Sequence, residues 1–316
     1  MTNSGKLQPD ILKAKVLSFT GSHRADLLVG GGLGEDAALI SVPHGILVAA
    51  SDPITGAATG AGRLLVHVNA NDLACKGADP SWLVVTLIVP AKMGADFIAE
   101  TMREIHETCC EMGIAIAGGH TELTEKYSSP VISGTMLGMT QYSLSTQNIH
   151  AGDAILATGH AGLEGMSIIA HDRPELFAGV FSDAEMSLIR SWQGDLSILR
   201  PAKILREYSR YMHDPTEGGL FGALCETAQA CGLGLELDGV PVHPLTVRAA
   251  EKLGFSAVNL ISSGMLLAVI PEERVPEAQR ALTSEGIDSR VIGHFVEGKS
   301  NVILDTHEEL WGILAL

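Results

Sequence analysis

Three aspartates in the first half of the chain stand beside predicted strand or helix starts. Asp36 follows the glycine-rich segment 30–34, Asp52 ends an apolar run, and Asp72 precedes Leu73-Ala74. Each aspartate taken singly is typical of a helix cap or a turn. Together their carboxylates offer the oxygen ligands that Mg²⁺ prefers, and Mg²⁺ held in this way can in turn hold nucleotide phosphates. The three residues therefore predict a site for a magnesium-bound nucleotide.

A pair of glycines begins a second polar cluster, Gly118-Gly119-His120-Thr121-Glu122. Glycine lacks a Cβ atom, so the backbone at these two positions can approach a ligand closely. Residues 114–117 predict a short strand, and we expect the cluster to form the loop that follows it. A surface turn with an exposed histidine is the alternative.

The densest group of reactive side chains is His213-Asp214-Pro215-Thr216-Glu217-Gly218-Gly219, which precedes a predicted helix at 220–230. Proline at a helix start is common. A histidine, two carboxylates and a threonine before a glycine pair are more than a helix cap requires. The segment therefore predicts a functional site, in which Glu217 or His213 is a candidate general acid or base.

The segment 293–300 matches the phosphate-binding pattern G-x-x-x-x-G-K-[ST] letter for letter. In a true P-loop the lysine and the serine open a helix whose N-terminus faces the phosphates. Here Lys299-Ser300 is followed by Asn301-Val302-Ile303-Leu304, which predicts a strand. We therefore interpret the segment as a hairpin turn and expect Lys299 not to bind nucleotide.

The rest of the pattern predicts the elements that position these residues. Apolar residues recur at helical spacing over 63–76 and 94–112, and Gly77 and Gly113 end those helices. Strands are predicted at 46–50, 82–89, 131–139, 154–158 and 264–270. Polar residues interrupt the pattern at 141–150, so we expect one domain over 1–147 and a second over 148–316. The elements do not alternate strictly, which favours an α+β fold.

The composition excludes several classes of partner. The 316 residues include 21 Lys+Arg against 37 Asp+Glu, a net charge of −16, and aromatics make up only 4%. Nucleic acids and anionic membranes require clustered basic side chains or stacking aromatics, so we expect neither. No apolar run approaches the about 20 residues of a membrane span, and the N-terminus shows no signal-peptide core. The five cysteines form no CxxC pair, which favours a soluble cytoplasmic protein with reduced thiols.

Taken in order, the motifs resemble those of the aminoimidazole ribonucleotide synthetase (PurM-like) superfamily, and most of all its hydrogenase-maturation HypE branch. The resemblance implies an N-terminal α/β domain whose sheet pairs with a second subunit, a C-terminal α+β domain, and ATP with Mg²⁺ in a cleft between them. The segments that carry it are Gly5-Lys6-Leu7, Gly34-Glu35-Asp36-Ala37-Ala38, Asn71-Asp72-Leu73-Ala74, Gly118-Gly119-His120-Thr121, Gly134-Thr135, His213 to Gly219 and Ser262-Ser263-Gly264.

The resemblance also implies roles for single residues. Asp36, Asp52 and Asp72 would be the Mg²⁺ ligands. Asp214 would complete the cleft from the second domain and would face the substrate together with His213 and Glu217. The expected catalytic residues are therefore His213, Asp214, Glu217 and His120. The family reaction phosphorylates an amide, carbamoyl or similar oxygen with ATP, after which a nucleophile attacks or phosphate leaves. Residues that would contact the nucleotide are Lys6, Gly34, Glu35, Asn71, Gly118, Gly119, Thr121 and Thr135.

Two departures from the HypE pattern affect the expected reaction. HypE proteins end in a cysteine that carries the carbamoyl group, whereas this chain ends Gly312-Ile313-Leu314-Ala315-Leu316. We therefore expect a homodimer that acts on a separate small or protein-borne carbamoyl or amide substrate. His120 stands where many members have Asp or Glu, which favours a contact to phosphate or substrate. A thiamine-monophosphate kinase type of enzyme and a non-catalytic nucleotide-binding accessory protein in metallocentre assembly remain as alternatives.

Overall fold

The computed structural model describes residues 5–6, 9–29, 39–40, 42, 45–54, 60–302 and 307–316. These residues form two compact units. Unit 1 comprises residues up to Leu73 together with Ala78–Gln141, and unit 2 comprises Tyr142–Leu316 together with the short segment Ala74–Gly77.

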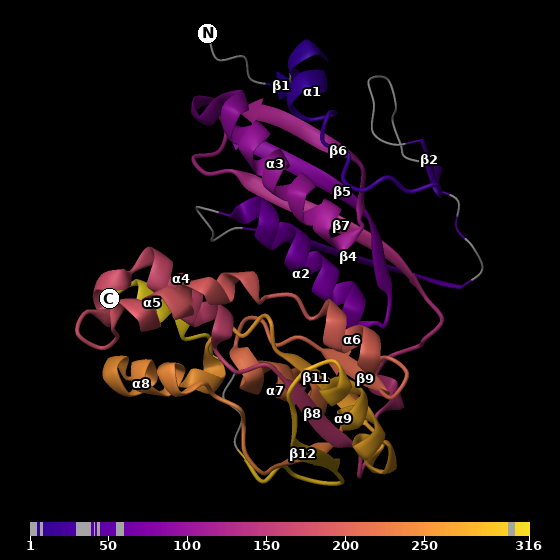
Figure 1. Cartoon of the computed structure of the whole chain (residues 1–316), viewed down its shortest axis with the longest axis vertical. Coiled ribbons are helices and arrows are strands. Elements are labelled where there is room, and N and C mark those ends of the chain that lie inside the picture. The colour runs from indigo at the N-terminus through magenta and orange to yellow at the C-terminus, as the bar shows by residue number, and fades with distance from the viewer. Residues whose placement is uncertain are drawn as a thin grey trace. The chain divides into compact units, whose positions relative to one another are not determined.

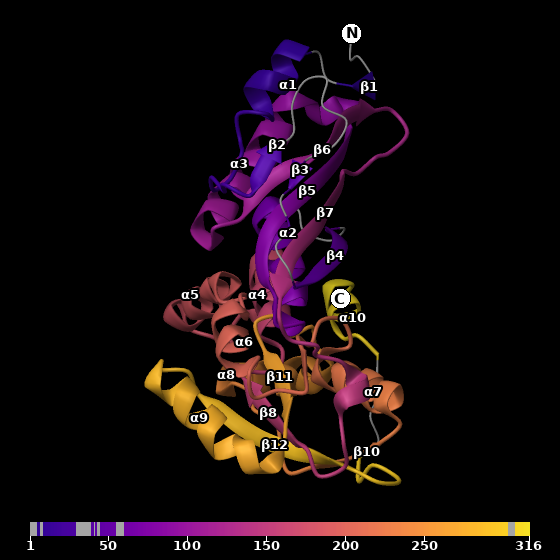
Figure 2. The same ribbon diagram turned by 90° about the vertical axis from the view of Figure 1, so that its right-hand side faces the viewer.

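Unit 1 is built on a five-stranded sheet with the strand order β1-β6-β5-β7-β4. Only the β5–β6 pair is parallel, and the other three pairs of this sheet are antiparallel. Helices α2 and α3 lie on the same face of this sheet (Figures 1 and 2). The elements of unit 1 are β1 (Gly5–Lys6), α1 (Pro9–Lys15), β2 (Leu27–Val29), β3 (Leu39–Ile40), β4 (Ile46–Ile54), α2 (Ala61–Cys75), β5 (Asp79–Pro90), α3 (Gly94–Met112), β6 (Ala115–Thr124) and β7 (Val131–Thr140).

Alternation along the strands explains why helices cover only one face. In β5, Leu83, Val85 and Leu87 are buried, whereas Val84 and Thr86 between them are only half-buried. Successive side chains of a strand point to opposite faces, so the buried set packs under α2 and α3. We call the other face of the unit 1 sheet the open face.

Unit 2 contains a second five-stranded sheet, with the order β10-β12-β8-β11-β9 and antiparallel pairing throughout. All five residues of the central strand β8 are buried, which is typical of a strand covered on both faces. The elements of unit 2 are β8 (Ala154–Thr158), α4 (Leu163–Asp172), α5 (Asp183–Ser191), α6 (Leu199–Leu205), β9 (Tyr211–His213), α7 (Gly219–Cys231), β10 (Gly234–Leu237), α8 (Pro244–Leu253), β11 (Leu266–Ile270), α9 (Val275–Ser284), β12 (Ser289–Val296) and α10 (Leu310–Leu314).

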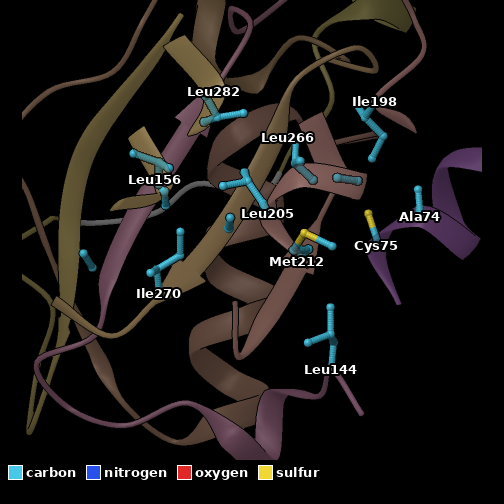
Figure 3. Close-up of a cluster of buried hydrophobic side chains, with 14 of the residues drawn as sticks. Ala74, Cys75, Leu144, Leu156, Ile198, Leu205, Met212, Leu266, Ile270 and Leu282 are labelled. Carbon is cyan, nitrogen blue, oxygen red and sulfur yellow. The ribbon is translucent and has the colours of Figure 1, made fainter. Parts of the chain in front are cut away.

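Two apolar layers enclose this second sheet. On one face, Leu156 of β8 packs with Leu205 of α6 and Leu282 of α9 (Figure 3). On the other face, Ile155 packs with Leu220 and Leu224 of α7. A third cluster joins α4, α5, α8 and α10. Figure 3 also shows the Cys75 sulfur beside Met212 of β9, so the end of α2 contributes to the core of unit 2.

The mixed helix and sheet architecture confirms the α+β fold class, and the helix predicted at 94–112 has the bounds of α3. Two local predictions were wrong. Residues 118–122 do not form a loop but lie inside the continuous strand β6, and Asp52 does not follow β4 but lies within it. Both errors have one physical cause, since glycine and aspartate were interpreted as strand ends although pairing with neighbouring strands holds these residues extended.

Neither strand nor helix begins at Lys299-Ser300, where a P-loop would have its helix. The strand β12 ends at Val296, and residues 297–302 are irregular. Asn301 donates its backbone N–H to the Leu235 carbonyl at 2.9 Å, so this segment lies along β10. The strand predicted from Asn301 onward was therefore wrong at residues 301–302, and residues 303–305 lie outside the described residues. Among the helices that the structure describes, none is both long and apolar enough to cross a membrane.

Candidate functional site

In unit 1, Asp52 is anchored to helix α2 through Asn69. The Asp52 backbone N–H donates to Asn69 Oδ1 at 3.0 Å, and Asn69 Nδ2 donates back to the Asp52 carbonyl at 3.4 Å. Asn69 is fully buried, and it also donates to the Leu65 carbonyl one helical turn away. This reciprocal pair fixes the backbone of β4 at Asp52, so the half-buried carboxylate is held on a rigid strand.

Sheet register brings the glycine motif and Asp52 into one row across four strands. Gly119 pairs with Val85, Val85 with Gly134, and Gly134 with Asp52. A Cβ atom on Gly119 would lie 1.8 Å from the Val85 carbonyl oxygen, so only glycine fits there. The glycine is therefore required by strand packing, which is a structural reason that the sequence motif did not predict.

The neighbouring row carries hydroxyl groups on the open face. Thr135 is opposite Ser51, and their hydroxyl oxygens are 2.9 Å apart. Ser51 also donates to the Gly134 carbonyl at 2.9 Å. Gly118 belongs to the same row through Val84. Thr135 and Gly118 thus lie close in register to Asp52, although alternation places the Thr135 side chain on the opposite face of the sheet.

His120 also points to the open face, at the far side of the sheet from β4. Its Nε2 is 3.3 Å from Glu122 Oε2, and both side chains are about one-third or more exposed. Lys6 of β1 is opposite Glu122 in register. Thr121 lies between His120 and Glu122 and is buried under the helices. The five-residue cluster is therefore divided between the two faces, and it does not present all its polar groups to one ligand.

Helix α2 carries the other predicted polar residues of unit 1. Asp72 follows Asn69 by three residues, so the half-buried Asp72 lies on the helix face that Asn69 turns toward β4. Asn71 is completely buried. Gly34, Glu35 and Asp36 lie outside the described residues.

The donor chemistry of unit 1 fits Mg²⁺, although the described residues contain no group of three or more ligating side chains. Asp52 and Asp72 supply hard carboxylate oxygens. Mg²⁺ in nucleotide sites is commonly held by one or two carboxylates together with phosphate oxygens and water, so an all-protein cage is not required.

In unit 2, Asp214 is buried where β9 leads into α7. Only 3% of its surface is exposed, and Cys75 donates its thiol to Asp214 Oδ1 at 3.5 Å. The residues after it are equally constrained. Gly219 has a φ of +62°, and a Cβ atom there would lie 2.5 Å from the Val258 carbonyl oxygen. The second glycine of the motif therefore permits the close packing that sets Asp214 in place.

A second buried carboxyl group lies near Asp214, in the first turn of α4. Glu164 is 5% exposed. Burial raises the pKa of Glu164 from 4.5 to about 7, and the charges of Asp214 and Glu308 also raise it. Hydrogen bonds from Ser263 lower this pKa but do not cancel the effect of burial. Its Oε2 atom has no hydrogen-bond partner among the described residues. Near neutral pH, Glu164 is therefore divided between its protonated and its charged form.

Glu308 stabilises the backbone around this pair of carboxyl groups. It accepts hydrogen bonds from the N–H groups of Gly218 at 2.6 Å, Leu310 at 2.8 Å and Ile261 at 3.2 Å. Burial raises the pKa of Glu308 although these three bonds favour its charged form. The carboxylate thus connects the glycine motif before α7 to the segment before β11.

The two candidate acid–base residues differ in accessibility. Glu217 is exposed, whereas His213 is half-buried with its Nε2 3.6 Å from Glu226 Oε2. Asp214 lies between them in the chain but is covered. A general base must reach its substrate, so Glu217 and His213 fit that role better than Asp214 does.

Three members of the unit 2 site were not predicted from the sequence: Cys75, Glu164 and Glu308. The signal for Glu164 was present, because it is the one charged residue in the otherwise apolar or small segment 161–170. An ionisable side chain within such a run is either buried or functional. Cys75 and Glu308 come from distant parts of the chain and have no local signal. None of the five cysteines, all of which the structure describes, forms a disulfide.

Comparison with known proteins adds the family. Residues 34–140 match the N-terminal domain of AIR synthase related proteins, and residues 150–305 match the C-terminal domain. A putative hydrogenase expression/formation protein of Methanocaldococcus jannaschii is 25% identical over 96% of this chain and 91% of its own length. The carbamoyl dehydratase HypE of Escherichia coli is 28% identical over 78% of this chain and 74% of its own.

Solved structures agree with this assignment at the level of the fold. A hydrogenase maturation protein HypE in complex with ATP superposes with a TM-score of 0.79 at 22% identity, covering 98% of this chain and 97% of that one. The thiamine-monophosphate kinase of Stenotrophomonas maltophilia superposes with a TM-score of 0.73 at 20% identity, covering 94% and 96%. With both of its domain types matched in order, the chain belongs to the family of AIR synthase related (PurM-like) proteins and is related to the HypE hydrogenase maturation proteins.

Proposed function

We propose that this protein is a Mg²⁺- and ATP-dependent enzyme that phosphorylates the oxygen of an amide or carbamoyl group, as a HypE-like carbamoyl dehydratase would. The observation that carries the proposal is the similarity to carbamoyl dehydratases over about four-fifths of the chain, with 27–28% identity. The ATP-bound HypE neighbour supports the choice of nucleotide.

The proposed reaction needs a leaving group and a base. Transfer of the γ-phosphoryl group to the amide oxygen gives an imidate phosphate and ADP. Loss of phosphate with the remaining N–H proton then leaves a nitrile, so one amide and one ATP give one nitrile, ADP, phosphate and one proton. Exposed Glu217 is our candidate for the base, with His213 as the second candidate.

The chain's own groups supply the surroundings of that reaction. Asp52 and Asp72 would hold Mg²⁺, which would neutralise charge on the transferring phosphoryl group. The buried Asp214 accepts a hydrogen bond from the Cys75 thiol, and it would position the segment that carries His213 and Glu217. Glu164, with a pKa of about 7, would be able to give or take a proton beside it near neutral pH.

Two further parts of the proposal concern assembly. We propose a homodimer, because the edge strand β4 exposes Ile46 and Leu47 by 44% and 49%. Apolar side chains exposed together on an edge strand favour pairing with another chain. A carbamoyl group would arrive on a small amide or on a partner protein, and a solved complex of HypE with HypF shows that a relative of this fold binds a protein.

The decisive experiment uses an amide labelled with ¹⁸O. If the amide oxygen is phosphorylated, the label must appear in the released phosphate, which mass spectrometry detects. The assay is run with a panel of small amides and, separately, with carbamoylated proteins from an extract of the cells that produce this protein. The panel that transfers the label shows whether the substrate is a small amide or a carbamoyl group on a protein. ATP consumed without transfer of the label would contradict the proposal.

Variants locate the nucleotide site in a separate binding measurement. Asp72→Asn should remove Mg²⁺-dependent ATP binding measured by calorimetry. Asp96→Asn is the matched control, because Asp96 is exposed and pairs with Lys15 across α1 and α3. Equal ATP affinity in both variants would exclude Asp72 as a ligand. Glu217→Gln should retain ATP binding and lose turnover.

A kinase reaction is the second candidate, supported by the thiamine-monophosphate kinase neighbour. It predicts a stable phosphorylated product in place of free phosphate and nitrile. ³¹P NMR of the reaction mixture distinguishes the two outcomes. ATP binding without any turnover would instead favour an accessory protein.

A further inference from the structure

Unit 2 contains a cavity of about 170 Å³. None of the residues that we assign to the proposed reaction lies in its lining. Its walls come from three segments of the chain, and its lining residues are His160, Leu163, Trp192, Asp195, His243 and Thr246. A dry cavity of roughly 150 Å³ in another protein is enough for one benzene molecule. The cavity therefore admits a small molecule or ion rather than a nucleotide.

The strongest indication of a ligand is a buried hydroxyl group without a partner. Thr246 is 0% exposed, and its Oγ1 has no hydrogen-bond partner among the described residues. A buried hydroxyl that makes no hydrogen bond costs about 1–3 kcal/mol. A threonine in a helix can satisfy itself by donating to a carbonyl in the preceding turn, and Thr246 does not. Because Thr246 also lines the cavity, a ligand that reaches this hydroxyl would supply its missing hydrogen bond.

Two helices begin at this cavity. Thr246 is the third residue of α8, and Leu163 is the first residue of α4. The N–H groups of a first helical turn have no carbonyl partners in their own helix, and they carry the positive end of the helix dipole. Some of these donors are used elsewhere: Pro244 has no N–H, Leu245 donates to the His243 ring, and Gly165 donates to the Ile261 carbonyl. An anion would therefore meet the dipole and the other N–H groups of the two turns. Both helices have ten residues, so each has a complete first turn. This arrangement favours negative charge.

Two imidazole rings complete the polar lining. His160 and His243 stack edge to face with ring centroids 5.6 Å apart, and Trp192 packs on His243 at 4.9 Å. His243 Nδ1 accepts the Leu245 N–H at 3.1 Å, so the neutral ring carries its proton on Nε2 and donates from there. Burial, and to a smaller extent the interaction with His160, lowers the pKa of His243 and so favours the neutral ring.

We propose that this pocket binds a small oxyanion, a carboxylate or a phosphate, through the Thr246 hydroxyl, the His243 ring and the first turns of α4 and α8. Asp195 is the one acidic side chain among the lining residues, and it is exposed to solvent. Its negative charge opposes an anion and would attract a cation. The effect of removing the Asp195 charge on binding therefore shows whether the ligand is negatively or positively charged.

The test titrates the full-length protein with inorganic phosphate and, separately, with acetate. The signal is the indole N–H resonance of Trp192 in an NMR spectrum, which is assigned by its absence in the Trp192→Phe variant. Because Trp192 lines the pocket, anions that bind elsewhere do not contribute to this signal. We expect at least one of the two anions to shift this resonance. A response to phosphate alone, or to acetate alone, identifies which oxyanion the pocket takes.

Three variants make the assignment specific. Thr246→Val should lower the affinity for the anion about tenfold, because it removes a hydroxyl that would bind the anion. The melting temperature should be unchanged or higher, because that hydroxyl has no partner among the described residues. His243→Asn should also weaken binding, since asparagine preserves the helix cap but not the imidazole. Asp195→Asn should tighten binding of an anion.

Thr227→Val is the matched control. Thr227 is equally buried in unit 2, but its hydroxyl donates to the Ala223 carbonyl within α7. It should leave anion affinity unchanged. Absence of any Trp192 shift with both anions, weaker binding in Asp195→Asn, or equal affinity in Thr246→Val would each overturn the proposal.

Discussion

Replacing Glu164 by glutamine should change how the stability of unit 2 depends on pH. The folded protein holds the Glu164 proton more tightly than the unfolded chain does, because burial raises the pKa of Glu164 from 4.5 to about 7. Unfolding therefore releases a proton between these two pH values, and the wild-type protein loses stability as the pH rises through this window. Below pH 4.5 both states are protonated, and above pH 7 no further loss occurs.

The size of the effect follows from the same two values. At about 1.4 kcal/mol for each pH unit, the loss amounts to about 3 kcal/mol at most. Glutamine resembles the protonated acid in shape and cannot ionise. The variant should therefore gain about 3 kcal/mol relative to the wild-type protein between pH 4.5 and pH 8, although the two are similar at the acidic end.

Urea denaturation at closely spaced pH values, followed by circular dichroism, measures this difference. Glu251→Gln is the control for the loss of a carboxylate, because Glu251 is exposed on α8. A difference between Glu164→Gln and wild-type protein that stays constant from pH 4.5 to pH 8 would show that Glu164 is ionised in the folded protein. In that case our account of the buried carboxyl pair would be wrong.

Three other perturbations test separate parts of the structure. Gly119→Ala should abolish soluble folded protein or lower its melting temperature strongly, because the new Cβ would overlap the Val85 carbonyl oxygen, whereas Gly194→Ala meets no neighbouring atom among the described residues and should be tolerated. Burial and the charge of Arg63 lower the pKa of His67 from 6.5 to about 4. The free energy of unfolding of the wild-type protein should therefore fall by up to about 3 kcal/mol as the pH falls through this window. A His67→Gln variant should lose this part of its acid sensitivity in urea titrations, and an unchanged dependence would argue against a buried neutral imidazole. Lys299→Ala should leave ATP affinity in calorimetry intact, because Lys299 does not begin a helix, and a lost signal would restore the P-loop interpretation.

The sequence predicted the long elements well because their apolar spacing is a local property. Helix α3 was predicted at its observed bounds since Ile98, Met102 and Ile105 recur on one face and Gly113 follows with a φ of +72°. The glycines of β6 were misinterpreted for the opposite reason. Their conformation is set by pairing with β5, which is distant in the sequence, and local propensity favoured a loop.

The site was predictable only in part, again for a physical reason. Asp214 could be singled out because a dense polar motif surrounds it. The residues that determine its chemistry come from elsewhere: Cys75 ends α2, Glu164 lies in the first turn of α4, and Glu308 lies near the end of the chain. Contacts across such separations follow from the fold and have no local pattern. The proposed roles of Asp52 and Asp72 depend on Asn69, which looked like an ordinary helical residue and proved to connect α2 to β4.

Stability alone does not explain why unit 2 retains Glu164. Above pH 7 the buried carboxylate costs about 3 kcal/mol, which is a large part of the roughly 5–15 kcal/mol that typically holds a domain together. Glutamine would fill nearly the same volume and could accept the same bonds from Ser263 without that cost. A group kept at this expense beside Asp214, with a pKa close to neutral, is suited to giving or taking a proton during a reaction. Its burial also restricts it to exchange through neighbouring side chains, which is consistent with an exposed residue such as Glu217 meeting the substrate directly.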